Sequence, residues 1–203
     1  MGSQPLPPFS GCRQLRKTGE EPADDGSHVS LPGRIVAGLS RYVDSSDPLV
    51  RANNVLALMV ASNQPFYPFY VRFVAGDDHG VSFLTLLSTP LFLALPMLAR
   101  WRPTLALAGI PVLGLVNGML AMKALGTVAG IDLFVIPCLL VALLVLHRDS
   151  WKVVVPAAAC AVLAFWAQYF WQGSPLHAFT GQALQSLYRL NAFSVAGLTL
   201  FIT

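Results

Sequence analysis

From Val55 onward the chain consists of long apolar runs separated by short polar breaks. An α-helix needs about 20 mostly apolar residues to cross the hydrocarbon core of a membrane. The pattern therefore predicts an all-α fold, a polytopic membrane protein built as a bundle of about six transmembrane helices. The predicted spans are residues 55–75, 81–99, 104–125, 131–147, 153–171 and 183–202. The last is the most polar, because Gln185, Arg189 and Asn191 lie in its first half.

The breaks between the first five runs are only a few residues long, at 76–80, 100–103, 126–130 and 148–152. Connections this short join elements that are neighbours in space, so we expect consecutive helices to pack as antiparallel hairpins. Residues 172–182 form the only longer linker.

Residues 1–50 differ from the membrane domain predicted over residues 51–203. The first 33 or so are rich in Pro, Gly, Ser and charge, a composition that favours disorder. Residues 34–51 allow two interpretations, a short amphipathic turn on the membrane surface or a solvated linker.

Composition supports a membrane protein and excludes several other classes. The chain is 55% hydrophobic and 11% charged, with a mean hydropathy of +0.60, whereas soluble domains carry about 25% charged residues. A net charge of +3 gives no concentrated basic face for nucleic acid. No catalytic motif is present, and the three cysteines have no metal-ligand spacing. We therefore expect neither an enzyme nor a bound cofactor or metal.

Basic residues predict the orientation, because cytoplasmic loops of membrane proteins are enriched in Lys and Arg. With the N-terminal tail in the cytoplasm, the inner ends of the spans carry Arg41, Arg51, Arg100, Arg102, Arg148 and Lys152. Only Arg72, Lys123 and Arg189 lie at the outer ends. The sequence thus predicts a multi-pass protein of the plasma (inner) membrane with both termini in the cytoplasm.

Polar side chains inside the predicted spans are the ligand or signal candidates, because such groups are costly in a membrane. Asn63, Gln64 and Asn117 fall near mid-depth, with Tyr67 beside them. The alternative is that the amides only hold helices together.

A second group of candidates, Arg72, Lys123, Asp132 and Arg189, gathers toward the outer face. One interpretation is an outward-facing polar pocket in which Arg72 or Lys123 pairs with Asp132. The other is snorkelling, in which long basic side chains reach the headgroups.

Prolines and small residues predict hinges and close helix contacts. Pro65, Pro68 and Pro137 are the candidate hinges, since proline bends a helix. Small residues let helix backbones approach closely, and the candidates for such contacts are Gly114, Gly118, Ala157 and Ala161.

Two segments and one connection resemble the six-span N-terminal membrane domain of bacterial histidine kinases, diguanylate cyclases and class III adenylate cyclases. The segments are Asn63-Gln64-Pro65-Phe66-Tyr67-Pro68, running on to Arg72, and Gly126-Thr127-Val128-Ala129-Gly130-Ile131-Asp132-Leu133-Phe134, running on to Pro137. The connection is the short basic turn between the fourth and fifth spans, which carries no soluble domain.

The resemblance implies a sensory anchor, a homodimer in the lipid bilayer, and a sixth helix that passes a stimulus to a cytoplasmic output domain or to a partner kinase or cyclase. The chain ends on the apolar run 195–203, so we expect that it was cut from a longer protein. Two alternatives are a scaffold and a small transporter or channel subunit, the latter with Asn63, Gln64, Asn117 and Asp132 along its path.

Overall fold

The structure is a computed structural model, and it describes residues 31–76, 80–146, 148–171 and 173–203. This part of the chain is helical and contains no strand, which confirms the all-α fold class. The predicted disorder of residues 1–30 lies outside the described residues. The α-helices are α1 (Leu31–Val43), α2 (Pro48–Asn63), α3 (Tyr67–Ala75), α4 (Thr89–Trp101), α5 (Pro103–Leu125), α6 (Val135–Leu143), α7 (Trp151–Trp171) and α8 (Gly181–Ile202). The 3-10 helices are η1 (Gln64–Phe66), η2 (Gly80–Ser88), η3 (Thr127–Ala129) and η4 (Ile131–Phe134).

Length and composition identify three candidate membrane helices among the described residues, where the apolar pattern predicted six. They are Gly80–Trp101, Pro103–Leu125 and Trp151–Trp171, close to the predicted runs 81–99, 104–125 and 153–171. The predicted fourth span is a shorter apolar helix, Ile131–Leu143. The predicted first span is divided into α2, η1 and α3, and α2 begins at Pro48 rather than at Val55. The predicted sixth span corresponds to α8 and retains its polar first half.

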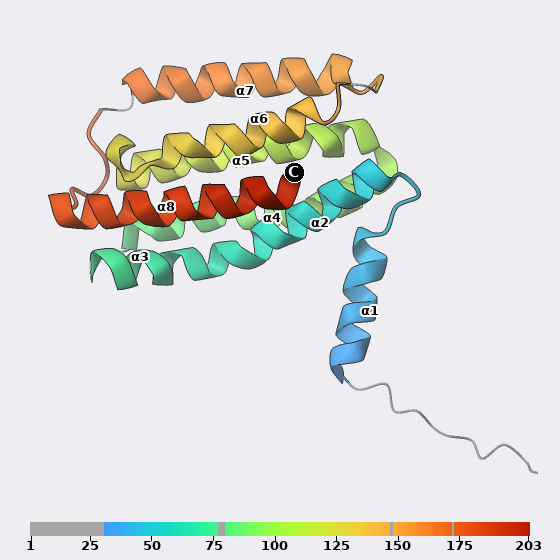
Figure 1. Cartoon of the computed structure of the whole chain (residues 1–203), viewed down its shortest axis with the longest axis horizontal. Helices are drawn as coiled ribbons and strands as arrows, with labels where there is room; N and C mark the ends of the chain where they lie inside the picture. The colour runs from blue at the N-terminus through green and yellow to red at the C-terminus, as the bar shows by residue number, and fades with distance from the viewer. Residues whose placement is uncertain (1–30, 77–79, 147, 172) are drawn as a thin grey trace, which may run out of the picture.

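Helices α2 to α8 run along a common direction, and α1 lies across that direction at the end where α2 begins (Figure 1). Helix α8 runs toward this same end. Helix α5 contacts α2, α4, α6 and α7, so it is the central helix of the bundle. Its sequence explains this position, because apart from a few residues, Asn117 and Lys123 among them, it is apolar around its whole circumference, and such helices are buried. The sequential pairs α4–α5, α5–α6 and α6–α7 are in contact.

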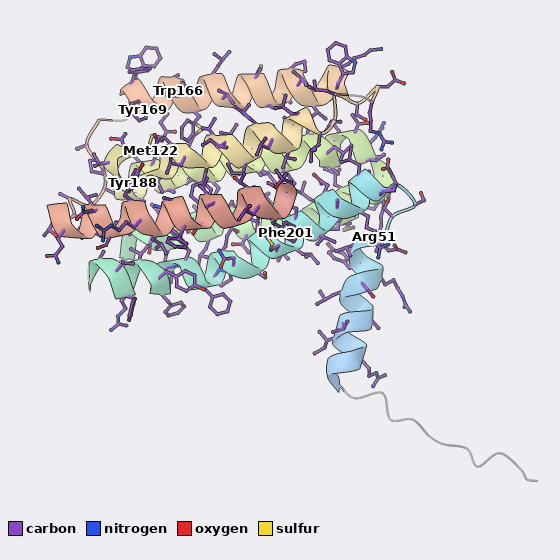
Figure 2. All side chains as sticks on the ribbon, viewed as in Figure 1. Arg51, Met122, Trp166, Tyr169, Tyr188 and Phe201 are labelled. Carbon is purple, nitrogen blue, oxygen red and sulfur yellow. The ribbon has the colours of Figure 1, made fainter. Side chains whose placement is uncertain are left out.

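Small residues let neighbouring helices approach α5, while larger side chains fill the interior around Met122 (Figure 2). A Cβ atom built on Gly114 would lie 2.6 Å from the Cys138 sulfur on α6. One built on Gly118 would lie 3.1 Å from Phe165 on α7. Glycine at these two positions therefore sets the spacing of α6 and α7 from α5. The other two packing candidates, Ala157 and Ala161, lie on α7 against buried core residues.

Helix α1 is tied to the bundle only near its C-terminal end. The Tyr42 hydroxyl donates to the Leu93 carbonyl at 2.6 Å, and the Asn54 amide donates to the Val43 carbonyl at 3.2 Å. Its apolar side chains Ile35, Val36 and Leu39 are exposed.

Candidate ligand-binding cavity

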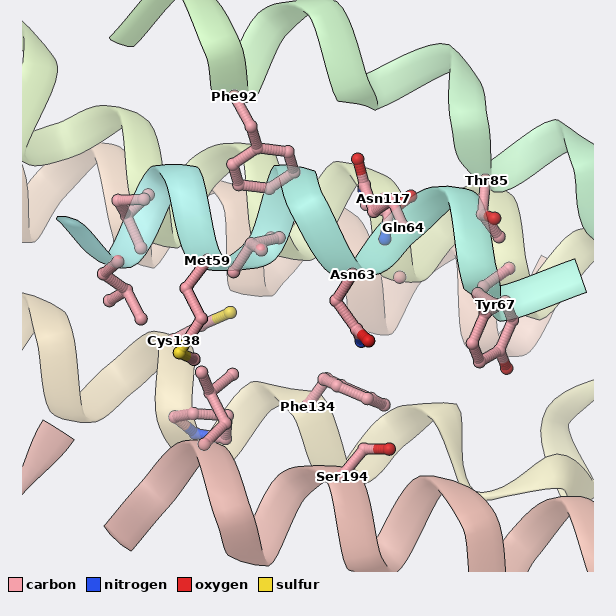
Figure 3. A pocket seen from close by; sticks show the side chains of 18 of the residues that line it. Met59, Asn63, Gln64, Tyr67, Thr85, Phe92, Asn117, Phe134, Cys138 and Ser194 are labelled. Atoms are coloured by element: carbon pink, nitrogen blue, oxygen red, sulfur yellow. The ribbon is translucent and has the colours of Figure 1, made fainter. Parts of the chain in front are cut away.

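A cavity of about 640 Å³ lies inside the bundle, between the α2–η1–α3 segment on one side and α6 and α8 on the other (Figure 3). Its size is within the range of pockets for drug-sized molecules, about 300–1,000 Å³. It is lined by Leu56, Met59, Val60, Ser62, Asn63, Gln64, Phe66, Tyr67, Tyr70, Thr85, Phe92, Ile110, Gly114, Asn117, Gly118, Ala121, Ile131, Phe134, Pro137, Cys138, Val141, Ser194, Gly197, Leu198 and Ile202.

The cavity lies where three helices change from 3-10 to α-helical geometry. Residues of η1, η2 and η4 all line it, through Gln64, Thr85 and Phe134 among others. In the first of these segments Pro65 has no N–H to donate to the preceding turn. The chain instead forms a 3-10 turn, in which the Tyr67 N–H donates to the Gln64 carbonyl. The helix then resumes with Pro68 in its first turn, where proline is tolerated. The third candidate hinge, Pro137, lies in the first turn of α6, directly after η4.

Helix η2 presents a row of hydroxyl groups toward the interior. A 3-10 helix has three residues per turn, so residues i, i+3 and i+6 lie in line. Ser82, Thr85 and Ser88 have this spacing and are all buried. The Thr85 hydroxyl donates to the Ser82 carbonyl at 2.8 Å, and the Ser88 hydroxyl lies 3.0 Å from the Thr85 carbonyl. The Thr85 and Ser88 hydroxyls therefore lie within hydrogen-bonding distance of backbone carbonyls of η2. Ser88, at the end of η2, lies beside the cavity wall.

Three of the predicted candidates, Asn63, Gln64 and Asn117, are brought together at one level of the cavity. The Gln64 Nε2 donates to the Ser88 Oγ at 2.6 Å, and this hydroxyl also lies 2.8 Å from the Asn117 Oδ1. These contacts join η1, the end of η2 and α5. Asn63 points across the cavity toward Phe134 and Ser194 (Figure 3).

Tyr67, the fourth candidate in this region, connects α3 to α8. Its hydroxyl donates to the Asn191 Oδ1 at 3.0 Å, and the Asn191 Nδ2 donates to the Ala129 carbonyl of η3 at 2.8 Å. Asn191 is fully buried. The two hydrogen bonds hold α8 against α3 and η3, and Tyr67 itself lines the cavity.

The outer charged candidates Arg72, Lys123, Asp132 and Arg189 are not among the described residues that line the cavity. The ion pairs between described residues are Arg51–Asp44, Arg148–Asp47 and Lys152–Asp149. None of these pairs joins Asp132 to Arg72 or Lys123, so the outward-facing polar pocket stays one of two open interpretations, beside snorkelling. The Lys123 amine donates to the Ser174 carbonyl at 3.1 Å, because the linker before α8 folds back over the end of α5. Arg72 and Arg189 are exposed.

Sequence reasoning missed several residues of this site. Thr85 and Ser88 lie inside the predicted span 81–99, and their spacing of three from Ser82 is the signal in the sequence for 3-10 geometry. In the sequence, Asn191 is one of three polar residues in the first half of the sixth apolar run, and nothing in the pattern distinguishes it from the other two. Ser194 gave no signal, because a single serine in an apolar helix is common.

The lining of the cavity is mostly apolar, with a few uncharged polar side chains. None of the described residues that line it is charged, and no three His, Cys, Asp or Glu side chains in the described part of the chain are grouped to hold a metal ion. Comparisons with protein-family models, curated proteins and solved structures found no match for the chain. The resemblance to bacterial six-span sensor domains stays a prediction.

Proposed function

We propose that this chain is a membrane-embedded input domain that binds a ligand in the cavity and passes the change through α8 to a cytoplasmic output domain, such as a kinase or a cyclase. The observation that carries the proposal is the position of the cavity. It lies between a broken helix, α2–η1–α3, and α8, the helix that the resemblance connects to an output domain. A ligand there contacts both elements, and it favours one arrangement by as much as it binds that arrangement more tightly.

The proposal includes six membrane crossings, formed by α2–η1–α3, η2–α4, α5, η4–α6, α7 and α8. Both termini then lie on the cytoplasmic side of a bacterial inner membrane. The excess of basic residues lies on the same side. The resemblance adds a homodimer, whose test is cross-linking of the full chain in membranes.

In the experiment that tests this, a cyclase catalytic domain is fused after Thr203 and its activity is measured. Because the cyclase needs cytoplasmic ATP, its activity also reports whether the C-terminus lies in the cytoplasm. Ser194→Leu should change cyclase output several-fold, since the larger side chain enters the cavity beside α2. Ala196→Leu is the matched control, because Ala196 is exposed and is not among the lining residues. Equal output from both variants and the unaltered fusion, at equal membrane levels, would refute the proposal.

A transporter is the second candidate, because broken helices around a mid-depth cavity are typical of secondary transporters. A transporter exposes its site to water from each side in turn. A cysteine introduced at Asn63 should then react with a water-soluble maleimide added from either side of the membrane. Protection of this cysteine from both sides would favour the input domain.

A further inference from the structure

We propose that the cavity binds a neutral amphiphile, an uncharged molecule with a hydroxyl head group and a single apolar tail, which enters from the lipid between α2 and α8. The ligand class rests on the proposed function only in that it names what the same cavity binds. The residues of the cavity wall identify it. Four features of the wall carry it: an unsatisfied amide, the division of polar and apolar residues, the absence of charge, and an opening beside Gly197.

The unsatisfied amide is Gln64. Its side chain is only 6% exposed and lines the cavity. Its Nε2 donates to Ser88, but its Oε1 has no hydrogen-bond partner among the described residues. A buried acceptor without a partner destabilises a protein. A ligand hydroxyl that donates to this oxygen removes the deficit, so Gln64 selects for a hydrogen-bonding head group.

The remaining polar side chains place the head group at one level. Asn117 and Gln64 meet through Ser88, and Asn63 faces Ser194 across the cavity (Figure 3). The Ser194 hydroxyl already donates to the Leu190 carbonyl at 3.0 Å, so it offers its lone pairs to a ligand. A ligand hydroxyl group fits between these side chains, because it can donate one hydrogen bond and accept others.

From this level toward the end where α2 begins, the wall is apolar. It is formed by Leu56, Met59 and Val60 of α2, Phe92 of α4, and Leu198 and Ile202 of α8. A tail can lie along these residues. A charged head group does not fit, because none of the described lining residues supplies an opposite charge, and an unpaired buried charge is strongly unfavourable.

The opening lies between α2 and α8. Ser62 and Asn63 on α2 and Gly197 on α8 line the cavity and are exposed. A Cβ atom built on Gly197 would meet nothing within 4 Å, so this helix position has empty space beside it. Large apolar side chains are exposed nearby, Phe66 of η1 and Phe193 of α8 among them. An opening with such a rim faces lipid, and its ligand reaches it through the bilayer.

The test uses photoreactive hexadecanol on the full chain in lipid nanodiscs, with cross-linked residues located by mass spectrometry. We expect saturable labelling of α2 and α8 that unlabelled hexadecanol competes away. Photoreactive hexadecanoate, which is charged, and a photoreactive alkane of equal length should label these sites at least about fivefold less, a ratio equivalent to one hydrogen bond. Equal labelling by all three probes would overturn the proposal.

Two variants test whether the ligand binds at this position in the cavity. Gln64→Leu removes the unpaired acceptor at nearly constant volume, but it also removes the hydrogen bond from Nε2 to Ser88. These two effects oppose each other, so the melting temperature should change little while the affinity for hexadecanol falls about fivefold. Gly197→Phe should block the opening and reduce labelling, while Ala196→Phe on the same helix should not. Unchanged labelling in both Gln64→Leu and Gly197→Phe would refute the site.

The labelling experiment tests the ligand class and the cyclase fusion tests the sensory function, so either result can be negative without the other. If hexadecanol labels the cavity but Ser194→Leu leaves cyclase output unchanged, the ligand class stands and the sensory function is wrong. If Ser194→Leu changes output but hexadecanol does not label the cavity, the input domain stands and the amphiphile is wrong.

Discussion

A single amide, Asn191, holds three elements together. It accepts from Tyr67 on α3 and donates to the backbone of η3, and it is completely buried in α8. In a membrane the helices gain little from apolar burial, so packing and interhelical hydrogen bonds decide which helices associate. Asn191 therefore determines where α8, the most polar of the long helices, attaches to the bundle.

Asn191→Ala should lower the free energy of unfolding by about 1–2 kcal/mol, because it removes two hydrogen bonds and leaves the Ala129 carbonyl unpaired. Unfolding of the purified chain in detergent measures this. Tyr67→Phe removes only one of the bonds and should cost less, and the double variant should cost less than the sum of the two. Ser194→Ala on the same helix is the control, since its hydroxyl bonds only to its own helix. A loss for Asn191→Ala no larger than that of the control would contradict this role.

At the scale of elements, the break in the first helix positions the amides of the cavity. An α-helix turns by 100° per residue and a 3-10 helix by 120°, so the η1 turn rotates α3 relative to α2. Gln64 faces Ser88 while the preceding residue, Asn63, faces α8, because successive residues of a helix point about 100° apart. The turn after them brings Tyr67 to face Asn191 on α8. The prolines at 65 and 68 maintain the break.

Replacing both Pro65 and Pro68 by Ala should allow a continuous α-helix, because the missing backbone donors return. We expect hexadecanol labelling to fall several-fold while thermal stability stays equal or rises. Pro156→Ala is the matched control, since Pro156 is an exposed proline inside α7 that is not among the lining residues. Undiminished labelling in the double variant, with normal labelling in the control, would show that the break is not needed for the cavity.

At the scale of the whole molecule, an ion pair joins the start of α2 to the turn between α6 and α7. Arg148 donates to both carboxylate oxygens of Asp47 at 2.8 and 2.6 Å, and Asp47 also caps α2 by accepting from the Leu49 N–H at 2.9 Å. Partial burial acts to raise the pKa of Asp47, but the hydrogen bonds from Arg148 and from the Leu49 and Val50 backbone outweigh it and lower the pKa below its ordinary value of 3.8.

A lowered folded-state pKa means that the ionised Asp47 stabilises the fold above pH 3.8, and that this stabilisation is lost as the pH falls through the folded-state value. Asp47→Asn keeps the helix cap but loses the ion pair. We expect it to be less stable than the unaltered chain at pH 7 by about 0.5 kcal/mol, because Arg148 is partly exposed and solvent screens the pair. The difference should disappear at low pH.

Thermal unfolding at a series of pH values measures the effect. Asp149→Asn is the control, because Asp149 is fully exposed and lies 4.0 Å from Lys152. A stability difference for Asp47→Asn that does not depend on pH would contradict the assignment.

The sequence by itself determined the all-α class and the position of the longest helices. The all-α class and the bounds of α5, α7 and α8 follow from the lengths of apolar runs, and run length is a local property. Gly114 and Gly118 were recognisable as contact positions because they lack side chains. The mid-depth amides were recognisable as candidates because polar groups are rare in apolar runs.

Only the tertiary structure decided which of these groups meet. Whether Gln64 reaches Ser88 depends on the rotation of two helices broken at different points, and whether Asp132 pairs with Arg72 or Lys123 depends on how their helix ends are turned. Such distances join residues far apart in the chain, and no local pattern encodes them. The cavity too depends on the tertiary structure, because it is the space between α2, α6 and α8. The hydrogen bond between Tyr67 and Asn191 holds α8 against α3 beside this space.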